Sequence, residues 1–122
     1  MISELKRLLS NSYSPYGSLC FSCIVVMKDG KTFSGATVKN AVYRDGIYAE
    51  QVAIARAVTE GYKYGDFEKL YLMVGSDDIK DLKYLNERVI TEFFEPFKSI
   101  ILYTLNEDRR VLKVGNLYNN IY

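Results

Sequence analysis

One stretch organises this chain: it reads Ala41-Val-Tyr-Arg-Asp-Gly-Ile-Tyr-Ala-Glu-Gln-Val-Ala-Ile-Ala-Arg-Ala-Val and ends at residue 58. Its first part, with a glycine at position 46, predicts a loop. The small and apolar residues from Val52 onward predict a helix that is packed on both sides. Glu50 is the one acid near the start of this helix. Its carboxylate could complement the positive end of the helix dipole, or it could be a catalytic acid or base at the edge of a pocket.

The length of the chain predicts the number of domains, and its net charge argues against some classes of binding partner. The chain has 122 residues, which suits one domain spanning 1–122 with a sizeable core. A net charge of +1 provides no field that would attract nucleic acid or an anionic membrane. The first nine residues carry charges within their apolar run, so they predict neither a signal peptide nor a membrane span. We therefore expect a cytoplasmic protein.

The absence of histidine restricts the possible chemistry most. Cys20 and Cys23 are the two cysteines, and they lie three residues apart in a predicted strand, which points their side chains to opposite faces. This spacing favours two ordinary buried thiols over a disulfide or a redox Cys-x-x-Cys motif, which normally opens a helix. A tetrahedral zinc site of nitrogen and sulfur ligands cannot be assembled within the chain, and triads that need an imidazole are excluded.

The rest of the chain alternates helical and strand patterns. Asp29-Gly30 between two strand-like runs predicts a hairpin, Gly61 can cap the helix that contains Glu50, and Pro96 stops the next helix. The predicted helices span 2–11, 46–61 and 79–94. The predicted strands span 20–27, 32–38, 67–74, 99–105 and 110–114, and residues 115–122 close the chain as a short helix or coil.

This order of elements predicts an α/β fold. Helices that alternate with strands place helices on both faces of a sheet, and the front hairpin makes the five-stranded sheet mixed. The expected architecture is therefore a three-layer α/β/α domain. Pockets in such folds form at the carboxyl ends of strands, where helix N-termini point, and this would place Glu50 at a pocket.

Several short motifs, in order and spacing, carry a resemblance to a known family over almost the whole chain. They are Ser14-Pro-Tyr-Gly, Asp29-Gly, Phe33-Ser-Gly, Asn40-Ala-Val-Tyr, Gly46-Ile-Tyr-Ala-Glu, Ala53-Ile-Ala-Arg-Ala-Val-Thr-Glu-Gly, Arg88-Val-Ile-Thr-Glu-Phe and Val114-Gly-Asn-Leu-Tyr. Together they resemble the small tetrameric, zinc-dependent cytidine deaminases. The resemblance implies the cytidine-deaminase-like α/β/α fold predicted above.

The resemblance also implies a zinc-water mechanism, in which a metal held by cysteines activates water and a glutamate moves the protons. The family motif is Cys-Ala-Glu on the second helix and Pro-Cys-x-x-Cys at the start of the third. Ala49 and Glu50 match this motif, and Glu50 is the implied proton shuttle. The three cysteine positions are occupied by Tyr48, Lys83 and Asn86, which do not bind zinc together. We therefore expect no zinc cofactor.

The substrate side of the resemblance is altered as well. The positions that hold the ribose hydroxyls in the family correspond to Thr37 and Lys39, followed by the matching Asn40. An ammonium only donates hydrogen bonds, so Lys39 cannot replace a carboxylate that accepts them. Phe21 begins the segment that lets the base approach, and Tyr122 corresponds to a C-terminal aromatic that reaches into a neighbouring subunit.

These replacements lead to two hypotheses. The first is a protein with the cytidine deaminase fold that has lost zinc-dependent deamination and acts as a nucleoside-binding or assembly module, that is, a pseudoenzyme. The alternative is an active cytidine or nucleoside deaminase that uses Glu50 with a non-standard metal arrangement or with ligands from another chain. A pyrimidine sensor and a thiol function of Cys20 and Cys23 are further possibilities.

The resemblance and the eleven tyrosines imply partners as well. We expect a pyrimidine nucleoside as ligand and a homo-oligomer, either a dimer or a tetramer. For the buried Glu50, the Lys83 ammonium could sit where zinc would and pair with the carboxylate. Alternatively, Lys83 is a solvated residue on the first turn of the third helix.

Overall fold

A computed structural model describes residues 1–15, 19–39 and 46–117. Its helices are α1 (Ile2–Ser10), α2 (Ala49–Thr59) and α3 (Glu87–Phe93), with two 3-10 helices, η2 (Ile79–Tyr84) and η3 (Val114–Leu117). Its strands are β1 (Phe21–Met27), β2 (Thr32–Ala36), β3 (Phe67–Val74), β4 (Ser99–Tyr103) and β5 (Arg109–Lys113).

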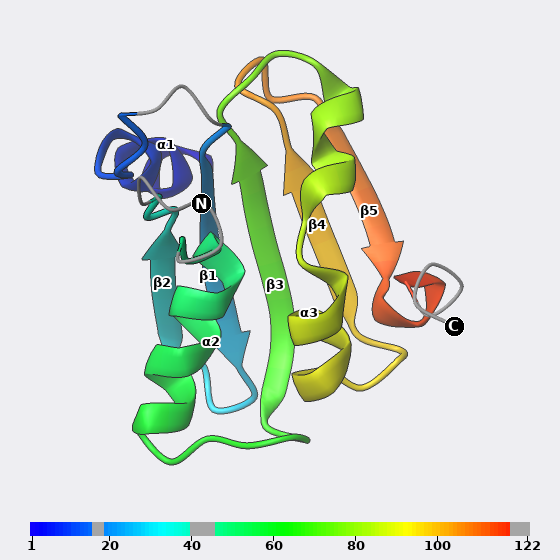
Figure 1. Ribbon diagram of the computed structural model, residues 1–122. Coiled ribbons are helices and arrows are strands. Elements are labelled where there is room, and N and C mark those ends of the chain that lie inside the picture. The colour runs from blue at the N-terminus through cyan, green and yellow to red at the C-terminus, as the bar shows by residue number, and fades with distance from the viewer. Residues whose placement is uncertain (16–18, 40–45, 118–122) are drawn as a thin grey trace.

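The five strands form one mixed sheet in the order β2-β1-β3-β4-β5 (Figure 1). Only the β3–β4 pair is parallel, and the other three pairs are antiparallel. The crossover through η2 and α3 makes that parallel pair possible, because parallel strands need a long connection. The predicted mixed five-stranded sheet is confirmed.

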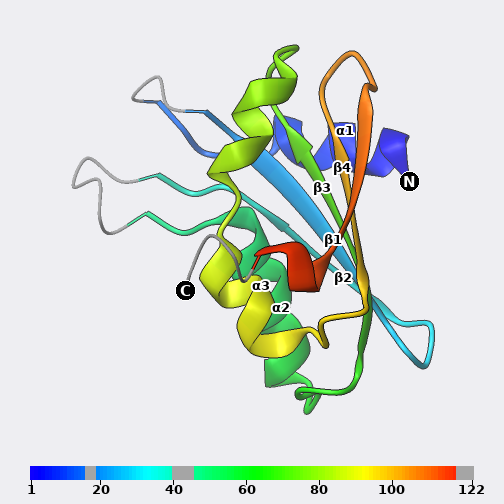
Figure 2. The same cartoon turned by 90° about the vertical axis from the view of Figure 1, so that its right-hand side faces the viewer.

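Helices cover both faces of the sheet, as Figure 2 shows from the side. The main core lies between the sheet and the helices α2 and α3, where Ile54 and Ile90 contact buried residues of β1, β3 and β4. A smaller cluster on the other face joins Leu5 and Leu8 of α1 to Ile24 and Met73. Strand β1 and the last three residues of β3 are therefore buried on both sides, which agrees with the apolar run at the end of β3.

The β1–β2 hairpin forms at the predicted position. Gly30 has a φ of 93°, a value that favours glycine, and the Asp29 carboxylate accepts a hydrogen bond from the backbone N–H of Lys31. Gly61, with a φ of 99°, follows the end of α2 as expected for a helix cap.

The predicted single helix over 79–94 is wrong. The chain forms η2, then two extended residues, Leu85 and Asn86, and then α3. Asn86 ends the first segment because its backbone N–H donates to the Glu50 carboxylate instead of to a helical carbonyl. Its side chain accepts from the N–H of Val89 and so begins a new helix.

Several predicted boundaries also shift. Helix α2 begins at Ala49 rather than at 46, because Ile47 exchanges two backbone hydrogen bonds with Val38 in an isolated bridge. Strand β4 ends at Tyr103, because residues 104–108 form the turn of the β4–β5 hairpin, which a hydrogen bond from the Thr104 N–H to the Asp108 carbonyl closes. Within the described ranges, no helix is long and apolar enough to cross a membrane.

Candidate functional site

Glu50 lies in the first turn of α2 and is only 1% exposed. Its Oε2 accepts the backbone N–H of Asn86 at 2.6 Å. Its Oε1 is buried and has no hydrogen-bond partner in the part of the chain that the structure describes. A buried carboxyl oxygen without a partner carries a desolvation cost, so this group is a candidate for function.

The surroundings of Glu50 raise the pKa of its carboxyl. Burial is the largest cause, and hydrogen bonds from the backbone N–H groups of Asn86 and of Glu50 itself oppose it, as does the positive charge of Lys39. Cys23 is fully buried, and burial, followed by the charge of Glu50, raises the pKa of its thiol. The Glu50 carboxyl therefore keeps its proton to a higher pH than an exposed glutamate does.

A cavity of about 500 Å³ lies at the Phe21 end of β1. It is lined by Leu19, Phe21, Thr37, Lys39, Tyr48, Asp81 and Tyr84, and we call it the β1 pocket. Tyr48 lines this pocket and directly precedes α2, so the start of that helix lies beside the pocket. Glu50, two residues further on, is enclosed by the protein next to this wall.

Three residues that the sequence marked as substrate-binding, Phe21, Thr37 and Lys39, meet in the β1 pocket. The Thr37 hydroxyl donates to the carbonyl of Phe21 at 3.2 Å and accepts its N–H at 2.9 Å. The hydroxyl proton is therefore committed to the backbone. The Lys39 ammonium lies 5.3 Å from the centroid of the Tyr48 ring, a cation–π contact.

The resemblance aligns the family's three zinc cysteines with Tyr48, Lys83 and Asn86. Tyr48 and Asn86 precede α2 and α3, and Asn86 reaches Glu50 through its backbone N–H. Lys83 is exposed, and its ammonium lies 5.1 Å from the centroid of the Tyr84 ring. A phenol, an ammonium and an amide are not a zinc donor set. No group of three or more His, Cys, Asp or Glu residues suited to a metal occurs in 1–15, 19–39 or 46–117.

The structure does not pair Lys83 with Glu50. No ion pair joins the two residues, because the 3-10 turn of η2 directs Lys83 to solvent. Among the described residues, the positive charge of Lys39 acts on the Glu50 carboxyl and lowers its pKa, against the larger effect of burial. Asn40 and Tyr122, also expected at the site, lie outside the described residues.

Ala49 is fully buried and packs against β2. This close approach requires Gly35, because a Cβ at that position would meet the Ala49 carbonyl oxygen and lie 2.7 Å from the Ala53 nitrogen. The glycine therefore allows the first turn of α2 to sit directly on the sheet edge, which fixes Glu50 in place.

Sequence reasoning missed Leu19, Asp81 and Tyr84 as lining residues of the β1 pocket. A continuous helix over 79–94 would give Asp81 and Tyr84 a different orientation from the one that η2 gives them. Asp81 also accepts a hydrogen bond from the Ser76 hydroxyl at 2.7 Å. The Ser76 and Asp78 turn before η2 was the available signal, since such residues begin short helices.

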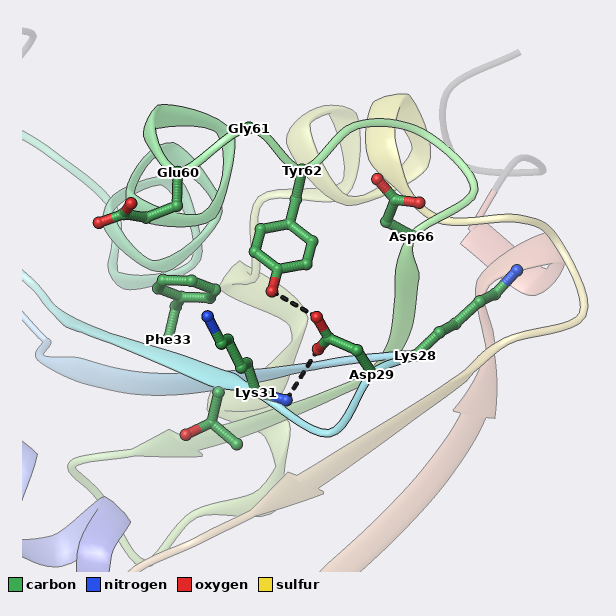
Figure 3. Close-up of a pocket in the computed structure, with 9 residues that line it drawn as sticks. Lys28, Asp29, Lys31, Phe33, Glu60, Gly61, Tyr62 and Asp66 are labelled. Atoms are coloured by element: carbon green, nitrogen blue, oxygen red, sulfur yellow. Dashed lines mark hydrogen bonds between the residues drawn. The ribbon is translucent and has the colours of Figure 1, made fainter.

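A second cavity lies at the opposite end of β1, beside the hairpin (Figure 3). Its polar side chains bind each other: the Tyr62 hydroxyl donates to the Asp29 carboxylate at 2.6 Å, and Asp29 also accepts from the Lys31 N–H. The Tyr62 ring contacts Phe33 edge to face. These contacts hold the hairpin against the residues that follow α2. The polar side chains that line this cavity therefore have a structural role.

Comparison with known proteins agrees with this fold. The family described as the cytidine and deoxycytidylate deaminase zinc-binding region matches residues 5–82, which is more than half of the chain. The chain therefore belongs to the cytidine and deoxycytidylate deaminase family, the family that the sequence motifs indicated.

Individual relatives extend the comparison. The cytidine deaminase of Sporosarcina psychrophila is 24% identical over 117 residues, covering 96% of this chain and 85% of the relative. That of Mycoplasma genitalium is 27% identical over 71 residues, and the match covers 58% of this chain and about half, 54%, of that relative.

Among solved structures, the cytidine deaminase from Burkholderia pseudomallei has a TM-score of 0.82 at 27% identity. The match covers 95% of this chain and 91% of that one. The Mycobacterium leprae enzyme, at 19% identity and a TM-score of 0.66, shares the fold.

Proposed function

We propose that this chain binds a pyrimidine nucleoside in the β1 pocket and does not carry out zinc-dependent deamination. The observation that carries this proposal is the donor set at the former metal positions. Tyr48, Lys83 and Asn86 offer no thiolate or imidazole, and the chain has no histidine and no cysteine after Cys23. Without a metal, nothing in this donor set lowers the pKa of a water molecule to the range that hydrolysis at neutral pH needs.

The position of Glu50 supports the same proposal. A proton shuttle must reach the atom that it protonates, within about 3 Å or through one water. Here one carboxyl oxygen is bound to the Asn86 N–H and the other is enclosed by protein. Glu50 thus connects α2 to the start of α3, which is a structural role for a residue that the family uses in catalysis.

The walls of the β1 pocket support nucleoside binding. Phe21, Tyr48 and Tyr84 offer aromatic rings, and base–aromatic stacking contributes about 1–3 kcal/mol per base. Tyr48 and Tyr84 are 40% and 52% exposed, and the ammonium groups of Lys39 and Lys83 lie over one face of each ring, so a base would stack on the other face.

The experiment combines metal analysis, an ultraviolet assay of cytidine deamination and thermal unfolding with cytidine or uridine. We expect no stoichiometric zinc, no turnover, and stabilisation by about 2.7 kcal/mol at a ligand concentration of 100 times Kd. Tyr84→Ala should weaken this stabilisation. Tyr64→Ala, which removes a similarly exposed tyrosine outside the β1 pocket, is the matched control. One zinc per chain together with turnover would overturn the proposal.

One observation favours the alternative of an active deaminase. Glu50 keeps the family position, and its pKa is raised, as suits a general acid or base near neutral pH. This alternative needs metal ligands from another chain or a different metal arrangement. It predicts deamination that Glu50→Gln abolishes, in the same assay.

We also propose that the chain forms a homo-oligomer in the cytoplasm. A hollow of about 590 Å³ lies on the outer side of α2, with Phe33, Ile47, Val52 and Ala55 in its lining. Ile47 is 43% exposed, so apolar surface is available there for a second copy. Light scattering after size-exclusion chromatography distinguishes a dimer or tetramer from the 14.0 kDa monomer.

A further inference from the structure

The β1 pocket has charges of opposite sign on two different segments. Lys39 follows β2, whereas Asp81 lies in η2, which packs against β3 and β4. Strand β1 lies between these segments in the sheet order. The aromatic residues Phe21, Tyr48 and Tyr84 line the space with them. A ligand that fits must therefore combine a flat ring with groups that suit a cation on one side and a carboxylate on the other.

The side of the pocket that follows β2 carries donors and few acceptors. Lys39 can only donate hydrogen bonds. The Thr37 hydroxyl already donates to the Phe21 carbonyl and accepts the Phe21 N–H. Among the described residues on this side, a sugar hydroxyl would find no carboxylate to accept its proton. An anionic oxygen placed here would accept a charge-assisted hydrogen bond, which is about twice as strong as a neutral one.

The Lys39 ammonium also influences the interior of the site. It lies over the Tyr48 ring at 5.3 Å, and its charge acts on the buried Glu50 carboxyl. The ammonium is thus directed into the pocket region rather than away from it. Lys39 is half-buried, and partial burial strengthens its attraction for an anion because water screens it less.

From this geometry we infer that the β1 pocket selects a pyrimidine nucleoside monophosphate over the free nucleoside, with Lys39 binding the phosphate and the aromatic rings stacking on the base. This inference rests on the proposed function and names its ligand class. Asp81 repels the phosphate and accepts hydrogen bonds from donor groups of the base or sugar. One of its oxygens binds the Ser76 hydroxyl, which holds the carboxylate in position. The charges of Lys39 and Asp81 therefore orient the ligand, with its phosphate toward Lys39 and away from Asp81.

The test measures the affinity of the purified protein for cytidine and its 5′-monophosphate, and for uridine and its 5′-monophosphate, by calorimetry at low salt. We expect the monophosphates to bind about tenfold tighter. Lys39→Gln should remove this difference, and Lys39→Glu should reverse it. Lys31→Gln, which removes an exposed lysine beside the hairpin, is the control and should preserve it. Inorganic phosphate alone should bind far more weakly than either monophosphate.

Each outcome separates the two proposals. Equal affinity for nucleoside and monophosphate in the unmodified protein would overturn the phosphate preference while leaving nucleoside binding intact. A preference that survives in both Lys39 variants would overturn the role of Lys39. If none of the four compounds binds, the proposed function itself fails.

Discussion

The carboxylates at the two ends of β1 differ in their burial and in their hydrogen bonding. At the hairpin end, the Asp29 carboxylate binds the Tyr62 hydroxyl and the Lys31 N–H, and Lys98 binds Glu68 at 3.0 Å. At the pocket end, Glu50 is almost fully buried and one of its oxygens has no partner among the described residues.

The physical consequence differs as well. The exposed contact between Asp29 and Tyr62 is screened by water and contributes little to stability, but it costs little to maintain. A buried carboxyl with an unmatched oxygen has lost its hydration without full replacement. The polar contacts at the hairpin end thus stabilise the local structure. At the pocket end, the Glu50 carboxyl is desolvated without full compensation by hydrogen bonds, which is typical of functional sites.

The largest expected contrast involves two glycines. In Gly35→Ala, the new methyl group would collide with backbone atoms of α2, so we expect a loss of about 3 kcal/mol in the free energy of unfolding. In Gly30→Ala, the new methyl group in the hairpin has no atom within 4 Å. The free energy of unfolding should fall only by the cost of a positive φ for alanine, about 1 kcal/mol. Urea unfolding measures both. Equal losses would mean that α2 does not depend on the close approach to β2.

A second contrast concerns pH and Glu50. Its pKa in the folded state is raised above the ordinary value of 4.5, so the folded state binds more protons than the unfolded state between these two pKa values. Stability should therefore fall as the pH rises through that window, by at most about 1.4 kcal/mol per pH unit. Glu50→Gln should remove this decline.

The control for that measurement is Glu60→Gln, which changes an exposed glutamate at the other end of the same helix. Thermal unfolding from pH 4 upward gives the profiles. If Glu50→Gln and the unmodified protein show the same pH dependence, the Glu50 carboxyl does not titrate abnormally.

The smallest expected effect lies at the hairpin end. The hydrogen bond to Asp29 is the main cause that raises the pKa of Tyr62 to about 12, and the charge of Asp66 contributes less. Asp29→Asn should bring the pKa of Tyr62 back toward 10.0. Asp66→Asn should change it less. Nuclear magnetic resonance of the tyrosine rings follows the titration, and an equal effect of the two variants would contradict the hydrogen bond.

Much of the fold follows from sequence patterns. The β-branched and apolar run of β1 and the strand-like run after it predicted the first two strands, Asp29-Gly30 predicted their hairpin, and the apolar run 70–74 predicted the buried β3. These elements depend on neighbouring residues and on simple burial, which a pattern of apolar and polar residues encodes.

The break after η2 could not be predicted in this way. It depends on a hydrogen bond between Asn86 and Glu50, which are 36 residues apart in sequence. The same break turns Lys83 to solvent and Asp81 into the β1 pocket. The resemblance placed Lys83 at a zinc-ligand position, which suggested either a pair with Glu50 or a solvated lysine, and in the structure Lys83 is exposed.

The sequence by itself determined the family, the mixed sheet and the absence of histidine and of any cysteine after Cys23, because these depend on residue identity and order. Only the tertiary structure decided that the charge of Lys39 acts on Glu50, that Thr37 is bound to the backbone of Phe21, and that Asp81 belongs to the pocket. The reason is physical: burial, charge and hydrogen bonding act between groups that are close in space, and the order of residues along the chain does not specify those distances.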